Sequence, residues 1–253
     1  MKTRFLVDDA TLLQAAVAVM AGVTEKALAL TSLVILGCLH GSAQTVQGLP
    51  EIDTYAELSS DLRVSFQVKE TREGGDPTQA EIGPSLDFYL KPLVQLQDTT
   101  EFDLDDSKSR PLVVTVGYRY LPQANNAPAI NRIEPVVTFH FPLKARFLLT
   151  DANRADLDWQ SGGFSWRYRN RFEIEKALRI GSYHPAPYAS AEIFYESQYG
   201  KWSDTAIYVG CLFPIGKHVE FNPYYEHQNN TGKNPNQQLN QLGLMLNLYF
   251  SIR

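Results

Sequence analysis

The sequence predicts an all-β protein, a single transmembrane antiparallel up-and-down β-barrel with about 10 strands, or alternatively about 12, and a polar lumen. Three observations favour this fold: a repeated alternation of apolar and polar residues, a C-terminal strand with leucine at alternate positions, and an apolar N-terminal segment typical of export. Alternation with a period of two indicates strands whose two faces meet different surroundings. One such strand does not separate a membrane barrel from a soluble sandwich, so the whole set of segments must decide.

Residues 1–43 are interpreted as a signal peptide with an atypical N-terminal extension, and residues 44–253 as the barrel. The apolar run from Ala27 to Leu39 is shorter than the roughly 20 residues of a spanning helix, which argues against a helical membrane protein. Lys26 precedes this run and Gly41-Ser42-Ala43 follows it, so we expect cleavage before Gln44. An N-terminal amphipathic helix is the competing interpretation.

The N-terminal segment also raises the questions of its start codon and of lipidation. Asp8 and Asp9 are acidic where a signal is normally basic, which would be explained if translation began at Met20. The box Ile35-Leu36-Gly37-Cys38 resembles a lipoprotein cleavage site, so attachment of a lipid to Cys38 stays open. A mature chain without Cys38 keeps a single cysteine, Cys211, so no internal disulfide is expected.

Half-apolar segments then follow one another to the C-terminus. The clearest places Phe164, Trp166 and Phe172 on one face and Arg167 and Arg169 on the other. The 202–213 segment is less regular, because Tyr208 and Leu212 lie on its polar face. Each segment is predicted as a strand with one apolar face. In chain order the segments are 62–69, 81–90, 112–120, 132–141, 146–159, 163–176, 188–196, 202–213, 219–226 and 241–250.

The connections predict an orientation. Pro142–Lys144 and Pro214–Lys217 are tight turns, whereas Leu121–Ala129 and Gln228–Gln238 are polar and rich in Asn, Pro and Gly. Outer-membrane barrels have short turns at the periplasmic end and longer loops outside. The exception is Val94–Arg110, which is interpreted as a periplasmic excursion, with a mobile linker as the alternative.

Segment length and aromatic positions also favour a membrane. Segments of roughly 10 residues or more exceed the usual soluble strand and suit a tilted crossing of the bilayer. Aromatic residues gather toward segment ends, as at Tyr118, Tyr120, Trp159 and Tyr225, where an interfacial girdle would lie. Counting back from a last strand that ends in the periplasm leaves Ile52–Leu58 as an extra segment, which must pair with another strand or lie outside the barrel.

The last strand carries the most specific signal. Its pattern of a polar residue, a glycine and then apolar residues resembles the β-signal that the outer-membrane assembly machinery recognises, and an unpaired strand edge can bind such machinery by augmentation. The chain continues through Ser251–Arg253, whereas such proteins usually end at the aromatic residue. The predicted partners are therefore outer-membrane lipids and this machinery, the latter through Gln241, Gly243, Leu246, Leu248 and Phe250.

Three stretches add a family resemblance. They are Trp166–Glu173, Pro187–Glu196 and Tyr224–Gln228. With them, the chain from about Ile52 to Phe250 resembles the uncharacterised outer-membrane barrel family catalogued as domain of unknown function 2490. The resemblance implies a fold and a location in the outer membrane but no activity.

The charged faces predict a filled lumen. A barrel of about 8 to 12 strands is narrow, and charges buried inside it must be paired. We expect the arginines of one strand to face the glutamates of following strands in a network that plugs or constricts the lumen. This candidate network, for which no ligand is predicted, comprises Arg167, Arg169, Arg171, Glu173, Glu175, Glu192, Glu196, Glu220, Glu226 and His140.

No catalytic, metal or cofactor site is predicted. His140 is interpreted as a hydrogen-bonded lumen residue, Ser190 near Glu192 is a weak hydrolase candidate, and the G-x-S-x-G motif is absent. The Asp103–Asp106 run lacks the glycine and distal glutamate of a calcium loop. The net charge of −5 and the absence of a Lys/Arg block argue against nucleic acid as a partner.

The sequence thus favours an exported outer-membrane barrel without a catalytic site, in a structural, solute-binding or solute-passage role. Two different functions stay open beside it. One is an outer-membrane hydrolase that modifies lipids; the second is a soluble periplasmic β protein that binds an apolar ligand.

Overall fold

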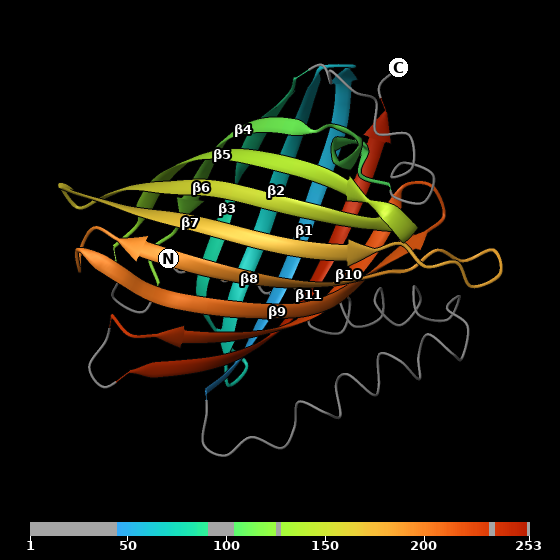
Figure 1. The fold of residues 1–253 in the computed structure, drawn as a ribbon. Helices are drawn as coiled ribbons and strands as arrows, with labels where there is room; N and C mark the ends of the chain where they lie inside the picture. The colour runs from blue at the N-terminus through green and yellow to red at the C-terminus, as the bar shows by residue number, and fades with distance from the viewer. Residues whose placement is uncertain (1–44, 91–103, 125–127, 233–235, 252–253) are drawn as a thin grey trace, which may run out of the picture. The chain divides into compact units, whose positions relative to one another are not determined.

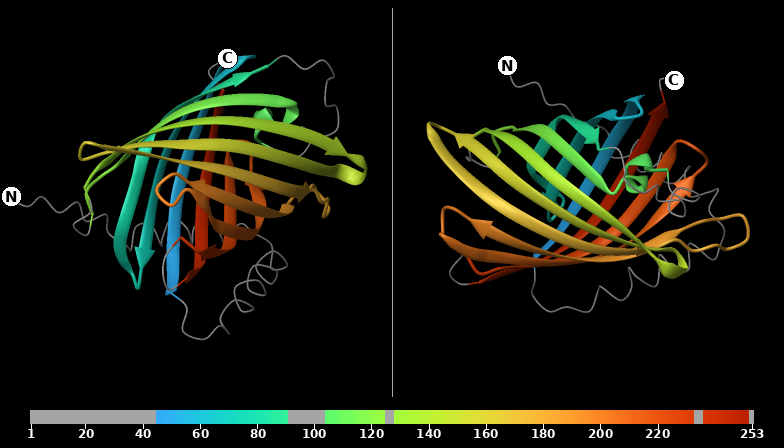
Figure 2. Two further views of the ribbon diagram at one scale, coloured as in Figure 1. Left: turned by 60° about the vertical axis from the view of Figure 1, so that its left-hand side comes forward. Right: turned by 45° about the horizontal axis from the view of Figure 1, so that its top comes forward.

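The computed structural model describes residues 45–90, 104–124, 128–232 and 236–251, which form a closed β-barrel (Figure 1). Successive strands lie side by side around the wall, and Figure 2 shows this single layer from two further sides. The strands are β1 (Thr45–Ser59), β2 (Leu62–Glu73), β3 (Asp76–Tyr89), β4 (Leu112–Leu121), β5 (Ile130–Leu143), β6 (Phe147–Gln160), β7 (Gly163–Lys176), β8 (Ala186–Glu196), β9 (Lys201–Ile215), β10 (Val219–Asn230) and β11 (Gln237–Ser251).

Two short 3₁₀ helices accompany the strands in the described residues, η1 (Asp106–Ser109) and η2 (Lys144–Arg146). Within these ranges no helix is long and apolar enough to cross a membrane, a finding that has no bearing on strands. The predicted leader and the cleavage site before Gln44 lie outside the described residues and stay a prediction.

The predicted all-β barrel is confirmed, but the even strand number is wrong because the barrel has eleven strands. The extra segment Ile52–Leu58 is part of β1, which pairs antiparallel with β2 and parallel with β11. Its Asp53, for example, is the register partner of Asn247 on the last strand. The parallel pair means that the chain enters the barrel at one end and leaves it at the other.

The four connections that predicted an orientation are grouped as expected, with 144–146 and 216–218 at one end and 122–129 and 231–236 at the other, but the remaining connections do not follow this pattern. The end at which β11 finishes carries the tight connections 60–61, 144–146 and 216–218, but also the two longest, 90–111 and 177–185. The opposite end carries 122–129 and 231–236 together with three tight turns. Loop length therefore does not distinguish the two ends of this barrel.

The strand faces match the predicted alternation, with the polarity of a soluble protein inverted. Charged residues face the lumen and are buried, as at Glu134 and Arg119, whereas large apolar side chains point away from it. Phe172 is 49% exposed and Ile207 is 59% exposed. A belt of apolar side chains thus surrounds the outside of the barrel.

One part of the lumen wall is apolar and aromatic. Tyr208 and Leu212, which made the 202–213 segment irregular, belong to this buried cluster. Two glycines make room for rings of neighbouring strands: a Cβ at Gly243 would lie 2.0 Å from Cζ of Tyr224, and one at Gly210 would lie 2.5 Å from the Tyr188 hydroxyl. The full cluster is Leu49, Ala186, Tyr188, Phe194, Ala206, Tyr208, Leu212 and Tyr224, with Met245 against it.

Gly243→Ala is therefore expected to destabilise the barrel. The added methyl group would force the Tyr224 ring out of its position, and overpacking of this kind costs about 1–3 kcal/mol. Denaturant unfolding followed by tryptophan fluorescence measures the loss. Gly48→Ala is the matched control, because the nearest atom to its Cβ is 4.0 Å away. The same Gly243→Ala change made in a Tyr224→Ala background should cost much less; an equal cost would show that the ring is not the cause.

Candidate functional site

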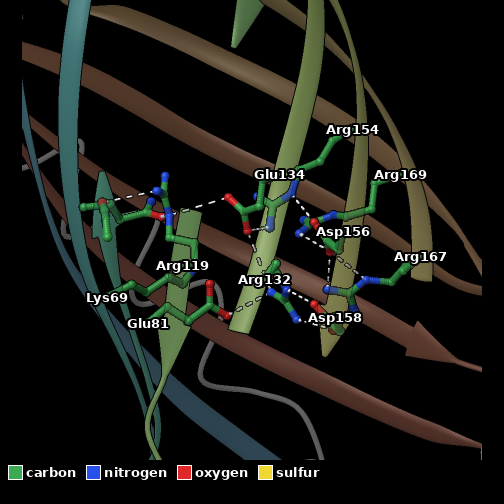
Figure 3. Close-up of polar contacts among 12 residues, drawn as sticks. Lys69, Glu81, Arg119, Arg132, Glu134, Arg154, Asp156, Asp158, Arg167 and Arg169 are labelled. Atoms are coloured by element: carbon green, nitrogen blue, oxygen red, sulfur yellow. Dashed lines mark hydrogen bonds and ion pairs between the residues drawn. The ribbon is translucent and has the colours of Figure 1, made fainter. Parts of the chain in front are cut away.

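A network of ion pairs lines the lumen along β6 and β7 (Figure 3). Its centre is Asp156, whose side chain is 0% exposed. Arg167 donates to this carboxylate at 2.8 Å, Arg154 bonds its other oxygen, and Arg169 lies 3.9 Å away. The alternation of β6 and β7 brings these side chains to one face, since Asp156 and Arg167 are register partners. One buried carboxylate thus holds three guanidinium groups in place.

Glu192 on β8 is a second centre. Arg169 donates to both of its oxygens, at 2.7 and 3.1 Å, and Arg171 donates to one at 2.9 Å. The Tyr208 hydroxyl also donates to it at 2.7 Å. Because Arg169 contacts both Glu192 and Asp156, the two centres form one continuous network.

The network continues onto β3 to β5. Arg132 donates to both oxygens of Asp158, at 2.7 and 3.0 Å, and lies 3.5 Å from Glu81. Glu134 is 3.5 Å from Arg119 and also bonds Arg154, which joins this part to β6 (Figure 3). A bidentate guanidinium–carboxylate pair is geometrically specific, so these contacts hold the wall in one arrangement.

The predicted network residues all face the lumen, but they do not form one cluster. Arg167, Arg169 and Arg171 contact Glu192 or Asp156, and Glu196 lies 3.9 Å from Arg167. The remaining members lie elsewhere. Glu173 lines the cavity, Glu175 contacts the segment after β3, His140 bonds that segment's end, and Glu220 and Glu226 lie on β10, three strands along the wall from β7.

Sequence reasoning overlooked the centre of the network. It looked for the partners of the β7 arginines on following strands, whereas Asp156 lies on the strand before them. The alternation of Arg154, Asp156 and Asp158 on β6 was the available signal. Arg132 and Glu134 on β5 carry the same pattern one strand further.

The arginines in this network reach further into the lumen than their acidic partners. The Arg171 side chain is 37% exposed while that of Glu192 is 3% exposed, and Arg167 is 28% exposed beside a fully buried Asp156. Both arginines line a cavity of about 560 Å³ inside the barrel. The β6–β8 wall of that cavity therefore presents guanidinium groups and N–H donors beside the Glu173 carboxylate.

Tyrosines line the same cavity on the neighbouring strands. Tyr188, Tyr208 and Tyr224 are buried there, and the Arg171 guanidinium lies 4.3 Å from the centroid of the Tyr208 ring. Tyr188 donates to Asn222 at 3.1 Å. Arginine over an aromatic face beside hydroxyl groups is suited to a polar or anionic solute and not to an apolar one.

The segment between β3 and β4 enters the lumen at the end where β11 finishes. We call residues 104–110 the plug. Asp105 caps η1 by accepting from the amide of Ser107 at 2.9 Å, and its carboxylate lies 2.6 Å from Arg63 of β2. Lys108 lies 2.5 Å from Glu175 of β7. Ion pairs with two distant strands thus hold the plug across the lumen.

Backbone contacts complete the docking of the plug. The carbonyl of Arg110 lies 2.7 Å from Nδ1 of His140, and the guanidinium of Arg110 donates to the carbonyl of Ser60 at 3.0 Å. The predicted excursion Val94–Arg110 is therefore wrong for residues 104–110, which lie inside the barrel. They fold inward because the lumen supplies the opposite charges for Asp105 and Lys108. Residues 94–103 lie outside the described residues.

Electrostatics favour the ionised form of Asp105 in the docked plug. Burial alone would raise the pKa of this carboxyl. The Arg63 guanidinium and the Lys108 ammonium outweigh burial and hold its pKa well below the usual range. Docking of the plug consequently depends on the charge of Asp105.

The remaining histidines and Ser190 do not assemble into a hydrolase site in the described part of the chain. His218 contacts the carbonyl of Tyr249 at 3.0 Å, and His227 contacts Asn240 at 2.9 Å. Ser190 is buried on the lumen face of β8, with Tyr208 and Glu173 as its register partners. None of the described His, Cys, Asp and Glu residues group as a metal site would require.

Comparison with known families matches residues 56–239 to the model described as a protein of unknown function, DUF2490. The match covers more than half of the 253 residues and confirms the resemblance inferred from the sequence. No curated protein matches the chain significantly.

Asp156→Ala should destabilise the barrel strongly. It removes the buried partner of three arginines, and deleting one member of a buried ion pair typically costs about 3–5 kcal/mol. The arginines are partly exposed, so we expect a loss near the lower end, measured by denaturant unfolding. Asp76→Ala, at the exposed start of β3, is the control and should change stability little. Equal effects of the two substitutions would show that Asp156 does not organise the wall.

Proposed function

We propose a function from the barrel itself, because the chain belongs to the DUF2490 family, whose description assigns no activity. The protein is an outer-membrane barrel without a catalytic site, and the plug closes its lumen. The observation that carries this proposal is the inverted polarity of the wall. Ionised side chains inside and an apolar belt outside are what a strand wall needs between lipid and an aqueous lumen. In water the same belt would be an unusually large exposed apolar surface.

The same distribution argues against a soluble periplasmic protein that binds an apolar ligand. Such a protein would have its apolar face inside, whereas this lumen is lined by charged groups and tyrosine hydroxyls. The lipid-modifying hydrolase is also less well supported. His140, its best candidate base, uses Nδ1 to contact the Arg110 carbonyl at 2.7 Å.

Location and assembly follow as parts of the proposal. Export by the leader of residues 1–43 would deliver the chain to the periplasm, and the β11 signal would present it to the assembly machinery. Leu246, Leu248 and Phe250 point outward toward lipid, while Gln241 and Gly243 face the lumen. If β11 ends in the periplasm, the plug lies at the periplasmic end of the barrel and Thr45 lies at the extracellular end.

The exposed guanidinium groups favour a second role, the binding and passage of a small anionic solute. Arg167 and Arg171 face the cavity, and the plug lies across one end of it. Passage would require the plug to leave. Passage of a solute requires that the barrel is inserted in the membrane, but the barrel could be inserted without passing any solute.

Phe172→Arg should oppose insertion. Phe172 is 49% exposed on the outer face, and arginine there should cost about 2–4 kcal/mol if the site lies near the bilayer midplane. Ser165→Arg on the lumen face is the control and should be milder, because Asp158 is its register partner. Folding into lipid vesicles and resistance to carbonate extraction measure the effect. In a water-soluble barrel Phe172→Arg would be harmless, so a harmless outcome contradicts the proposal.

Releasing the plug should open the barrel. Asp105→Asn together with Lys108→Gln removes both ion pairs, so we expect anion-selective openings in planar bilayers where the parent is silent. Glu70→Gln, on the outer face beside Arg72, is the control. A large stable conductance of the parent would contradict the closed lumen.

Low pH should also release the plug and open the barrel. The pKa of Asp105 is lower in the docked plug than in a released one. Its contribution to docking is therefore complete above the ordinary aspartate pKa of about 4 and is lost as the pH falls below that value toward the docked pKa. Openings of the parent should become frequent in this acidic window. The Asp105→Asn variant should respond less to the same change in pH, and an identical response would assign the effect to other carboxyl groups.

A further inference from the structure

A polar cluster interrupts the apolar outer belt near the middle of β6 and β7. Asp151 and Asn153 of β6 and Asn170 of β7 occupy outward positions, where the strand alternation otherwise places apolar residues. The register pairs Asp151 with Phe172, which is exposed on the outside, and Asn153 with Asn170. None of the three lines the lumen cavity. We call these three residues the outer polar cluster.

The cluster is tightly bonded within itself. Asn170 donates both amide hydrogens, to Asp151 at 2.6 Å and to Asn153 at 3.2 Å. Asn153 donates to the second oxygen of Asp151 at 3.3 Å. The Tyr168 hydroxyl donates to the Asn153 carbonyl at 2.5 Å. Both oxygens of the carboxylate are therefore satisfied by neighbouring side chains.

Apolar residues continue along both strands on either side of the cluster. Phe147 and Leu149 precede it on β6, and Leu157 and Trp159 follow it. On β7 it lies between Trp166 and Phe172. The cluster thus lies within the belt and not at its rim. If the barrel spans a membrane as proposed, a carboxylate and two amides would face hydrocarbon there, which is costly and usually marks a function.

Two hydrogen-bonding groups of the cluster have no partner in the described part of the chain. They are the second amide hydrogen of Asn153 and the carbonyl oxygen of Asn170, one donor and one acceptor on adjacent strands. A two-fold axis along the membrane normal brings equal depths of two copies together, so the donor of each copy can meet the acceptor of the other, and the contact contains two such hydrogen bonds. The hydrocarbon chain of a lipid offers neither a hydrogen-bond donor nor an acceptor.

We propose that the outer polar cluster is the centre of a two-fold contact between two copies of this barrel in the membrane. Asn153 of each copy donates to Asn170 of the other, and the amides shield the carboxylates from lipid. Asparagine is among the side chains that hydrogen-bond between neighbouring helices inside membranes, and the same donor and acceptor can act between two strand walls. Exposed apolar side chains surround the cluster and would form the rim of the contact: Phe139, Phe141, Trp166, Phe172, Ile174 and Ile193. This inference rests on the proposed membrane insertion.

The test is the oligomeric state of the full chain in lipid vesicles, measured by energy transfer between labelled copies over a range of protein-to-lipid ratios. The parent should associate, and Asn153→Leu with Asn170→Leu should raise the dissociation constant about tenfold or more. Thr54→Leu removes an outward polar group of β1, remote from the cluster, and should leave association unchanged. Carbonate extraction of the same samples reports insertion separately, so loss of association in an inserted barrel is distinguishable from failure to insert.

Cross-linking gives a second measurement. In a Cys38→Ser, Cys211→Ser background, copies with Asn153→Cys mixed with copies with Asn170→Cys should form a disulfide-linked dimer. A monomeric parent at all ratios would overturn the proposal. So would an associated parent that the leucine substitutions leave unchanged, because its interface would then lie elsewhere.

Discussion

The parallel pairing of β1 with β11 is the contact on which the barrel depends, because without it the sheet would have two open edges. It also sets which side chains face inward. Strand side chains alternate, so a slip of one residue along this seam would turn the lumen face of β1 outward. Asp53 and Glu51 would then face the outside and Ile52 the lumen. The inward face of β1 thus depends on a register set between the first and last strands.

Once the barrel is closed, the lumen must neutralise its own charges. A wall one strand thick has no second layer to separate carboxylates from the interior, so each must find a partner across neighbouring strands. Asp156 and Glu192 do this by sharing arginines, which leaves part of each guanidinium group free to face the cavity. Rigidity of the wall and the N–H donors that face the cavity therefore come from the same ion pairs. The plug uses the same principle, with Asp105 and Lys108 inserted between charges of β2 and β7.

The outside of the barrel obeys the opposite requirement, and the polar exception on β6 and β7 is informative. If the barrel spans a membrane as proposed, the apolar belt needs no partner there, whereas the outer polar cluster does, and it satisfies most of its groups within β6 and β7. The lumen and the cluster lie on opposite faces of these two strands. A contact between two copies would therefore act on the same strands that carry the Asp156 centre.

The sequence by itself determined the all-β class, the strand segments from 62 onward and which face of each strand is polar. It could do so because a period of two is a local property of side-chain direction. Most members of the lumen network, such as Arg169 and Glu192, were predictable for the same reason.

The tertiary structure alone decided what depends on contacts between distant residues. The parallel closure was hidden because Gly48 and Pro50 blur the alternation of β1. The inward fold of the plug was hidden because its partners, Arg63 and Glu175, lie far away in the chain. The outer polar cluster was hidden because Asn153 and Asn170 meet only through the register of β6 and β7.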